Sequence, residues 1–299
     1  MSPNDVRRRL RRRADELGLD FQQAIQYYAI ERFLFRLSKS DFASALVVKG
    51  ATMLRVWDGA IARPTRDIDF LGRLDRSPEA VEAVVRSCLI TDVPDDGLTF
   101  DEVAVTELIA LDSKYPGVRA KIRGTLEGAR FVLQLDIGVD DAAVPPPDWV
   151  DYPTLLEGPS PRILAYHPVT AVAEKFEAIV SLGLANSRMK DFYDLWMLAT
   201  TLSFAGPELR ESIAATFANR QTQLPTEAPV GLTAEYVGQE NVAPMWSAFA
   251  RKLDASGIKA PPSLFEAVRV IKRFIMPPVL AAGAQEEFGA VWSPEHGWQ

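Results

Sequence analysis

Six prolines lie within residues 145–161 and separate two parts of the chain that differ in sequence periodicity. Before them, apolar and polar residues alternate from about residue 103 to 139, as they do in half-buried strands. After them, apolar residues recur at three- and four-residue spacing almost to the end of the chain, which is typical of amphipathic helices. The change of period predicts an α+β protein, in which a mixed α/β core is followed by a helical C-terminal domain.

The local patterns refine this division. Two helical segments precede the core, and within the core short strands at 46–49 and 68–71 are each followed by a helix. The alternating region contains a hairpin whose strands meet at Glu127-Gly128. We therefore expect four parts: a helical N-terminal lead (1–44), a core (45–144), a proline-rich linker (145–161) and a helical C-terminal domain (162–299).

The composition excludes several classes of protein. The 299 residues include one cysteine and two histidines, so neither a disulfide framework nor a cysteine-based zinc site is available. No apolar run approaches the ~20 residues that a membrane-spanning helix needs, and the N-terminus has no apolar stretch of the signal-peptide kind. We expect a cytoplasmic monomer that acts as an enzyme or a binding protein, with an unanchored tail at 294–299.

Charge is distributed unevenly along the chain. The net charge is −7, but residues 1–13 contain six arginines and one aspartate, which leaves −12 on the other 286 residues. Two interpretations of the basic segment stay open. It is either the solvated face of a helix or a segment that binds the backbone of RNA.

The strongest candidate for chemistry is the segment Asp67-Ile68-Asp69. On a strand, Asp67 and Asp69 point to one face and Ile68 points to the other. Two carboxylates on one face repel each other unless a cation lies between them, and oxygen ligands suit Mg²⁺ or Mn²⁺. Asp136, at the end of the clearest strand pattern, is a candidate for a third carboxylate. Such a group can hold metal ions that activate a hydroxyl and stabilise a leaving pyrophosphate.

A turn of small residues precedes these aspartates. Gly50, Ala51 and Thr52 follow a short strand and open a helix. Glycine lets a ligand approach the backbone closely, and the N–H groups at the start of a helix favour anions such as phosphate. The turn therefore predicts contact with the phosphate groups of a nucleotide. Arg66, next to Asp67, is a further candidate for this role.

The helical half carries charges within an apolar pattern. Lys190, Asp191 and Asp194 share a helix face at i,i+3 and i,i+4 spacing, and Phe192 and Tyr193 lie among them. Two interpretations stay open: exposed ion pairs, or charges buried beside aromatic rings that need a partner or a ligand. Lysines in such a position are suitable ligands for a triphosphate.

Four segments in this order resemble the AbiEii-type nucleotidyltransferases, which include the MenT-like toxins of toxin–antitoxin systems. They are Gly-Ala-Thr at 50–52, Asp-Ile-Asp at 67–69, Glu-Lys-Phe-Glu-Ala at 174–178 and Arg-Met-Lys-Asp-Phe-Tyr-Asp at 188–194. The resemblance implies a nucleotidyltransferase-like core with a small mixed sheet flanked by helices. One position departs from the family pattern, because Ala51 stands where glycine or serine is usual.

The resemblance also implies roles for individual residues. The catalytic residues would be Asp67, Asp69, Lys175, Lys190, Asp191 and Asp194. Metal ions would be held by Asp67, Asp69 and Asp136. The nucleotide would be bound by Gly50, Ala51, Thr52, Arg66, Lys175, Arg188 and Lys190. Asp191 and Asp194 would fix the lysines or orient the base or acceptor. Thr65 is a candidate site of regulatory phosphorylation, since a phosphate there adds negative charge beside the carboxylates.

The implied reaction is the transfer of a nucleoside monophosphate from an NTP to an RNA acceptor, with Mg²⁺ or Mn²⁺ as cofactor and pyrophosphate as product. The resemblance implies that the acceptor is the 3′ end of tRNA, that its modification blocks translation and growth, and that a cognate antitoxin exists. Two alternatives stay open. One is a protein acceptor, as in AMP transfer, and the other is an inactive module that binds a nucleotide or a partner.

Overall fold

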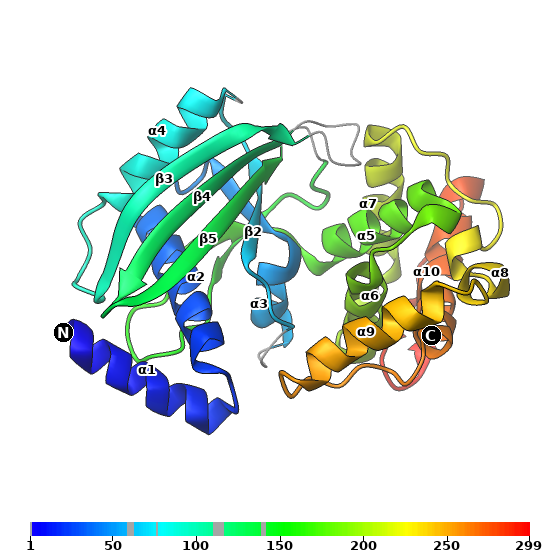
Figure 1. Ribbon diagram of the computed structural model, residues 1–299. Coiled ribbons are helices and arrows are strands. Elements are labelled where there is room, and N and C mark those ends of the chain that lie inside the picture. The colour runs from blue at the N-terminus through cyan, green and yellow to red at the C-terminus, as the bar shows by residue number, and fades with distance from the viewer. Residues whose placement is uncertain (1, 59–62, 76, 110–116, 139–141) are drawn as a thin grey trace. The chain divides into compact units, whose positions relative to one another are not determined.

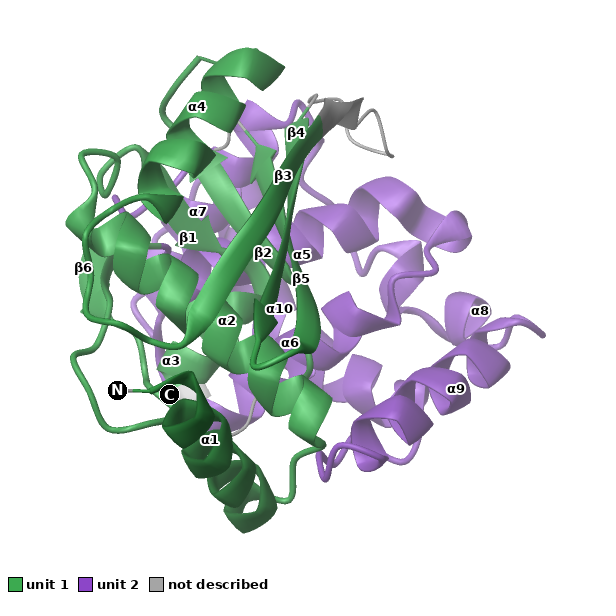
Figure 2. Ribbon diagram, turned by 60° about the vertical axis from the view of Figure 1, so that its left-hand side comes forward, with its two compact units in different colours: residues 1–140, 148–165 green, residues 141–147, 166–299 purple. Residues whose placement is uncertain are grey.

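The computed structural model describes residues 2–58, 63–75, 77–109, 117–138 and 142–299, so residues 110–116 and 139 of the expected alternating region lie outside the described residues. The chain forms two compact units (Figure 2). Unit 1 comprises residues 1–140 and 148–165, and unit 2 comprises residues 141–147 and 166–299. These bounds differ from the expected division. Most of the expected linker at 145–161 is part of unit 1, and it contributes one strand to the sheet of that unit.

Unit 1 is built on a seven-stranded mixed sheet in the order β3-β4-β5-β2-β1-β7-β6. The strands are β1 (Leu46–Lys49), β2 (Asp67–Gly72), β3 (Leu98–Ile109), β4 (Gly117–Leu126), β5 (Ala129–Gly138), β6 (Asp148–Asp151) and β7 (Arg162–Ala165). β2 runs parallel to β5 and antiparallel to β1. Alternation along each strand assigns the two faces: on β4, Ala120 and Ile122 are buried, whereas Lys121 and Arg123 between and beyond them are exposed.

The helices of unit 1 contribute side chains to the same hydrophobic core as the apolar face of this sheet. They are α1 (Pro3–Leu17), α2 (Phe21–Lys39), the short 3₁₀ helix η1 (Gly50–Met53), α3 (Leu54–Asp58) and α4 (Pro78–Leu89). In Figure 1, α2 and α4 lie behind strands β3, β4 and β5. Ser2, Asp20 and Ser77 cap the helices that follow them, as their sequence positions predict. The expected N-terminal lead is therefore part of the same core as the sheet.

Helix α2 carries buried charges that the sequence patterns did not predict. Arg32 and Arg36 form ion pairs with Asp96. Glu31 is 1% exposed, and one of its carboxylate oxygens accepts a hydrogen bond of 2.7 Å from the backbone N–H of Leu155. Burial raises the pKa of the Glu31 carboxyl to about 7, because the charged form loses its hydration.

This shift makes the stability of the chain depend on pH. The folded chain binds the Glu31 proton more tightly than the unfolded chain, so the contribution is fully present below the unfolded pKa of about 4.5 and is lost as pH rises through about 7. In the wild type, the free energy of unfolding should fall by about 3 kcal/mol between low pH and pH above 7 because of Glu31, and we expect Glu31→Gln to remove this dependence on pH. Urea unfolding of both proteins at about pH 5 and pH 8 measures it, and an identical pH dependence of the two would contradict the prediction.

Unit 2 is helical, as the sequence period predicts. Its α-helices are α5 (Pro168–Leu182), α6 (Met189–Thr201), α7 (Gly206–Asn219), α8 (Ala234–Val237), α9 (Val242–Asp254) and α10 (Leu264–Ala284), with 3₁₀ helices η2 (Gly183–Ala185) and η3 (Val230–Leu232). Among the helices that the structure describes, none combines the length and the apolar character that crossing a bilayer requires.

The prediction of an unanchored tail at residues 294–299 is wrong. Strands β9 (Val291–Ser293) and β10 (Gly297–Trp298) form a small sheet with β8 (Phe204–Ala205). The indole N–H of Trp292 donates to the carbonyl of Ala199, and that of Trp298 donates to the carbonyl of Phe274, both at 2.8 Å. The tail is anchored because each indole combines ring packing with a hydrogen bond at its polar edge.

Candidate active site

Neighbouring strands bring the three predicted carboxylates to one face of the sheet of unit 1. Asp67 and Asp69 are partly buried on β2, and Ile68 between them is fully buried on the other face. Because β2 pairs in parallel with β5, Asp69 lies opposite Asp136, and Asp67 lies opposite Gln134. Residues directly opposite each other on paired strands share a face. The expected closeness of Asp136 to the pair is therefore observed.

The same row of side chains continues onto the strands on either side. Lys49 on β1 lies opposite Asp69, and Arg119 on β4 lies opposite Asp136. The Arg119 guanidinium forms a bidentate ion pair with Asp136, with Nε–Oδ1 and Nη2–Oδ2 distances of 2.7 and 2.8 Å. Hydrogen bonding to Asp136 raises the pKa of Arg119, and the charges of Asp67 and Asp69 add to this shift. Arg119 therefore lies within the electrostatic field of all three carboxylates.

Arg119 is a site residue that was not predicted from the sequence, although the sequence carries a signal for it. A hairpin with the two-residue turn Glu127-Gly128 fixes the register of its strands. Arg119 lies eight residues before Glu127 and Asp136 lies eight residues after Gly128, so the predicted turn itself makes them cross-strand partners.

Asp136 differs from the expected third metal ligand. Both of its oxygens accept hydrogen bonds from Arg119, and the side-chain amide of Gln134 donates to Oδ2 at 3.1 Å. Within the described residues, no group of three His, Cys, Asp or Glu side chains is arranged to hold a metal ion. The guanidinium neutralises the third carboxylate, which leaves Asp67 and Asp69 as the candidate ligands. Two partly buried carboxylates on one face supply the oxygen donors that Mg²⁺ and Mn²⁺ prefer, so these residues fit such an ion.

Asp69 lies against the turn that follows β1. Gly50 has a φ of +69°, and a β-carbon at this position would come within 2.0 Å of Oδ2 of Asp69. Glycine is therefore required twice here, for the left-handed backbone and for the space that the carboxylate occupies. Because the left-handed conformation falls on Gly50 and not on Ala51, alanine at the second position costs no backbone strain.

Replacing Gly50 by alanine tests this close approach. We expect at least a tenfold loss of the reaction that depends on Asp69, since an added β-carbon displaces its carboxylate and a misplaced catalytic group costs ~1.4 kcal/mol or more. Gly257→Ala is the matched control, because Gly257 has a φ of +72° and nothing within 4 Å of an added β-carbon. Equal activities of the two variants would show that the contact with Asp69 is unimportant.

The rest of the turn is less accessible than expected. Ala51 is 5% exposed and Thr52 is 1% exposed, and the Thr52 hydroxyl donates to the backbone carbonyl of Asp67 at 3.3 Å. The hydroxyl of Thr65 donates to the same carbonyl at 3.0 Å. These two side chains therefore fix the backbone at Asp67, and the turn offers a nucleotide its backbone rather than the Thr52 hydroxyl. Arg66, beside Asp67, is exposed.

In unit 2 the predicted charges form a buried ion cluster. The Nζ of Lys175, on α5, lies 2.6 Å from Oδ2 of Asp194 and 3.1 Å from Oδ1 of Asp191, which are both on α6. The Nε of Arg188 lies 2.7 Å from Oδ2 of Asp191. The two aspartate side chains are 0% and 2% exposed, so these are not exposed ion pairs. The aspartates hold Lys175, as expected for one of the two lysines.

Lys190 differs from the expectation. The sequence spacing placed it on one face with Asp194, but Lys190 is exposed while Asp194 is fully buried and pairs with Lys175. Packing within unit 2 buries the apolar side of α6 together with both aspartates. Lys190 is therefore left on the side that faces solvent.

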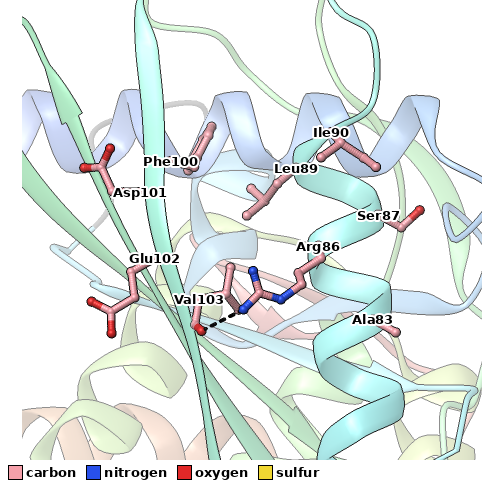
Figure 3. A pocket seen from close by; sticks show the side chains of 9 residues that line it. All are labelled: Ala83, Arg86, Ser87, Leu89, Ile90, Phe100, Asp101, Glu102 and Val103. Carbon is pink, nitrogen blue, oxygen red and sulfur yellow. Dashed lines mark hydrogen bonds between the residues drawn. The ribbon is translucent and has the colours of Figure 1, made fainter.

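A hollow of about 500 Å³ between α4 and the edge strand β3 contains none of these residues (Figure 3). Its lining is mainly apolar, with Asp101 and Glu102 on the strand and Arg86 on the helix. The Arg86 guanidinium donates to the backbone carbonyl of Val103 at 3.4 Å. None of the predicted carboxylates or lysines lines this hollow, so the carboxylate face remains the candidate active site.

One known protein family matches most of the chain. Residues 32–270, about four fifths of the chain, match the family described as nucleotidyl transferase AbiEii toxin of type IV toxin–antitoxin systems. Two solved structures from Helicobacter pylori are distantly similar, both with a TM-score of 0.47. JHP933 is 14% identical, with 85% of this chain and 88% of that chain covered. A candidate nucleotidyltransferase is 15% identical, with 89% and 97% covered.

No curated protein matches the chain. The matched family region contains both Asp67 and Asp69 on β2 and the whole ion cluster around Lys175. The chain therefore belongs to the AbiEii family of nucleotidyltransferase toxins of type IV toxin–antitoxin systems.

Proposed function

We propose that this nucleotidyltransferase toxin transfers a nucleoside monophosphate from an NTP to the 3′-hydroxyl of tRNA and thereby blocks translation. The observation that carries the proposal is the pair Asp67 and Asp69 on one face of β2, beside the turn at Gly50. Membership of the family supports the reaction class. The tRNA acceptor rests on the resemblance to the MenT-like toxins and on the basic N-terminal helix.

In this reaction the acceptor oxygen attacks the α-phosphorus, the bond to the bridging oxygen breaks, and its electron pair leaves with pyrophosphate. Asp67 and Asp69 would hold Mg²⁺ or Mn²⁺, which when bound favours ionisation of the attacking hydroxyl and neutralises charge on the leaving group. Gly50 leaves the space that Asp69 occupies, and the hydroxyls of Thr52 and Thr65 fix the backbone of Asp67. Arg119 neutralises Asp136 and so limits the negative charge that an incoming triphosphate meets.

The same proposal assigns phosphate binding to several basic groups. They are Lys175, Lys190, Arg188 and Arg66, together with the backbone of Gly50, Ala51 and Thr52. Arg188 is bound to Asp191 through Nε while 47% of its side chain is exposed, which suits a guanidinium that also contacts a ligand. Asp191 and Asp194 act through Lys175, whose ammonium group they hold in one position.

Incubation with unfractionated tRNA, each α-labelled NTP in turn and Mg²⁺ tests the proposal. Label in tRNA with the wild type, and none with Asp69→Ala, would support it and identify the nucleotide. Label in protein alone would replace the tRNA acceptor by a protein acceptor. No label in either, with Mn²⁺ also tried, would contradict enzymatic transfer and favour an inactive binding module.

The family also implies a cognate antitoxin. We expect expression of the chain without that antitoxin to stop growth, and expression of Asp69→Ala to permit it. Because tRNA and NTPs meet in the cytoplasm, the proposal includes a cytoplasmic location, and we propose that the chain acts as a monomer.

Thr65 is a proposed point of regulation. Its hydroxyl donates to the carbonyl of Asp67, and a phosphate there would remove this donor and add ~1.5–2 negative charges beside the carboxylates. We expect Thr65→Glu to lower transfer by about tenfold or more, which corresponds to ~1.4 kcal/mol. Thr65→Ser retains the hydroxyl and is the control. A labelling rate in tRNA that is unchanged in Thr65→Glu would contradict this prediction.

A further inference from the structure

Strand β4 carries three basic residues at successive alternate positions on the face that also holds the candidate active site. These residues are Arg119, Lys121 and Arg123, and the residues between them are buried. Arg119 forms an ion pair with Asp136, whereas Lys121 and Arg123 are exposed. Lys121 lies opposite Gln134, which lies opposite Asp67. The exposed basic residues therefore begin next to the carboxylates and lead away from them along the strand.

Helix α1 is fixed at the far end of the same hairpin. Val6, Leu10 and Ala14 are almost fully buried in the core of unit 1. Nη1 of Arg7 donates to the carbonyl of Glu127, in the turn between β4 and β5, at 3.0 Å. Figure 1 shows α1 beside the end of β4 at which the hairpin turns. The arginine-rich segment is therefore a docked helix in a fixed position, and not a loose arm.

The side of α1 opposite its buried residues is strongly basic. Arg7, Arg8, Arg11 and Arg12 line a shallow hollow of about 410 Å³ together with Asn4 and Asp15. The side chains of Arg8 and Arg12 are 79% and 81% exposed, and their ion pairs with Asp5 and Glu16 are exposed as well. Exposed pairs of this kind contribute ~0–1 kcal/mol, so a polyanion can displace them at little cost.

The charges of this surface contrast with those of the chain as a whole. Residues 117–130 contain four basic residues and one acidic residue, whereas the net charge of the protein is −7. A polyanion is repelled by most of an acidic protein and attracted to its basic surface, which orients its approach. From Lys121 to Glu127 the strand extends ~20 Å, which is long enough to lie along several phosphate groups of an RNA backbone.

We propose that Lys121, Arg123 and Arg130, together with the exposed arginines of α1, form one basic surface that binds the phosphate backbone of the RNA acceptor. Arg130, on β5, lies opposite Thr125 and is exposed, so it continues the surface towards the turn. The RNA runs along β4 from α1, and its 3′ end reaches the face that carries Asp67 and Asp69. This inference rests on the proposed function, since it identifies the surface that holds the acceptor.

Binding of unfractionated tRNA in the absence of NTP and divalent ions tests the surface separately from the reaction. We expect Lys121→Ser with Arg123→Ser to weaken binding about tenfold near physiological salt. The slope of the logarithm of the binding constant against the logarithm of salt concentration should fall in magnitude by about 2, for two lost phosphate contacts. Arg8→Ser with Arg12→Ser should have a similar effect.

Arg86 provides a control that is matched to Arg123. Arg123 is 67% exposed and lies 2.6 Å from Glu102, and Arg86 is 55% exposed and lies 2.6 Å from Glu82. Arg86 is on α4, beside the hollow in Figure 3, and outside the proposed surface. Arg86→Ser should leave the affinity for tRNA unchanged, whereas Arg123→Ser alone should lower it several-fold.

The two proposals fail in different ways. Equal losses from Arg86→Ser and Arg123→Ser, or no binding of tRNA by the wild type, would overturn the proposed surface. Binding through this surface with no labelling of tRNA by any NTP would leave the surface standing and overturn the proposed reaction. Labelling of tRNA that is as fast in Lys121→Ser with Arg123→Ser as in the wild type, at tRNA concentrations below saturation, would overturn the surface alone.

Discussion

Replacement of Asp69 by alanine should lower nucleotide transfer by at least about 10³-fold and leave the fold intact. Asp69 lies at the centre of the row that runs from Lys49 to Arg119, and with Asp67 it supplies the carboxylate oxygens that fit a divalent ion. Loss of one of two such ligands removes several kcal/mol of stabilisation of the charge that develops on the leaving pyrophosphate. Asp69 is only partly buried and repels Asp67, so its removal leaves no buried charge without a partner.

The measurement is the rate of incorporation of the preferred α-labelled NTP into tRNA, together with the unfolding temperature of each variant. Asp69→Asn keeps the size of the side chain and removes its charge, so it should be as inactive as Asp69→Ala. Asp101→Ala, an exposed aspartate on β3 of the same unit, should retain the wild-type rate. If Asp69→Ala kept more than about a tenth of the wild-type rate, the metal site would have to lie elsewhere.

The local repeat of apolar and polar residues predicted those features of the site that depend on one strand or one helix alone. The period of two placed Asp67 and Asp69 together, and capping residues predicted where α1, α2 and α4 begin. The partner of Asp136 was also implied by the predicted turn at Glu127-Gly128, because the turn fixes the register of the hairpin.

Contacts between distant segments could not be predicted in this way. Asp96 pairs with arginines that lie 60 and 64 residues before it, and Glu177 binds Arg220, 43 residues further along. These pairs depend on how helices and loops pack, which local periodicity does not determine. The burial of Asp194 and the exposure of Lys190 have the same origin. The sequence spacing predicts which residues share a helix face. Which part of that face is buried depends on how the neighbouring helices pack against it.

The cluster around Lys175 gives the largest expected effect on stability. Asp194→Ala should lower the free energy of unfolding by about 3–5 kcal/mol, because it removes one partner of Lys175 from a buried ion cluster. Lys175→Met should cost at least as much, since it leaves the fully buried Asp194 without its cation. Urea unfolding of the full chain measures both. A change below about 1 kcal/mol in either variant would contradict the burial of the pair.

Removal of both partners separates the structural role of Lys175 from its proposed contact with the NTP. In Lys175→Met with Asp194→Leu, two apolar side chains of similar size replace the ion pair, and such replacements often restore or raise stability. We therefore expect the double variant to be more stable than either single variant and still defective in labelling tRNA. Lys190→Met is the exposed control: it should change stability by less than about 0.5 kcal/mol and raise KM for the NTP. Recovery of transfer along with stability would mean that Lys175 only holds the two helices together, and that the phosphates are bound by other residues.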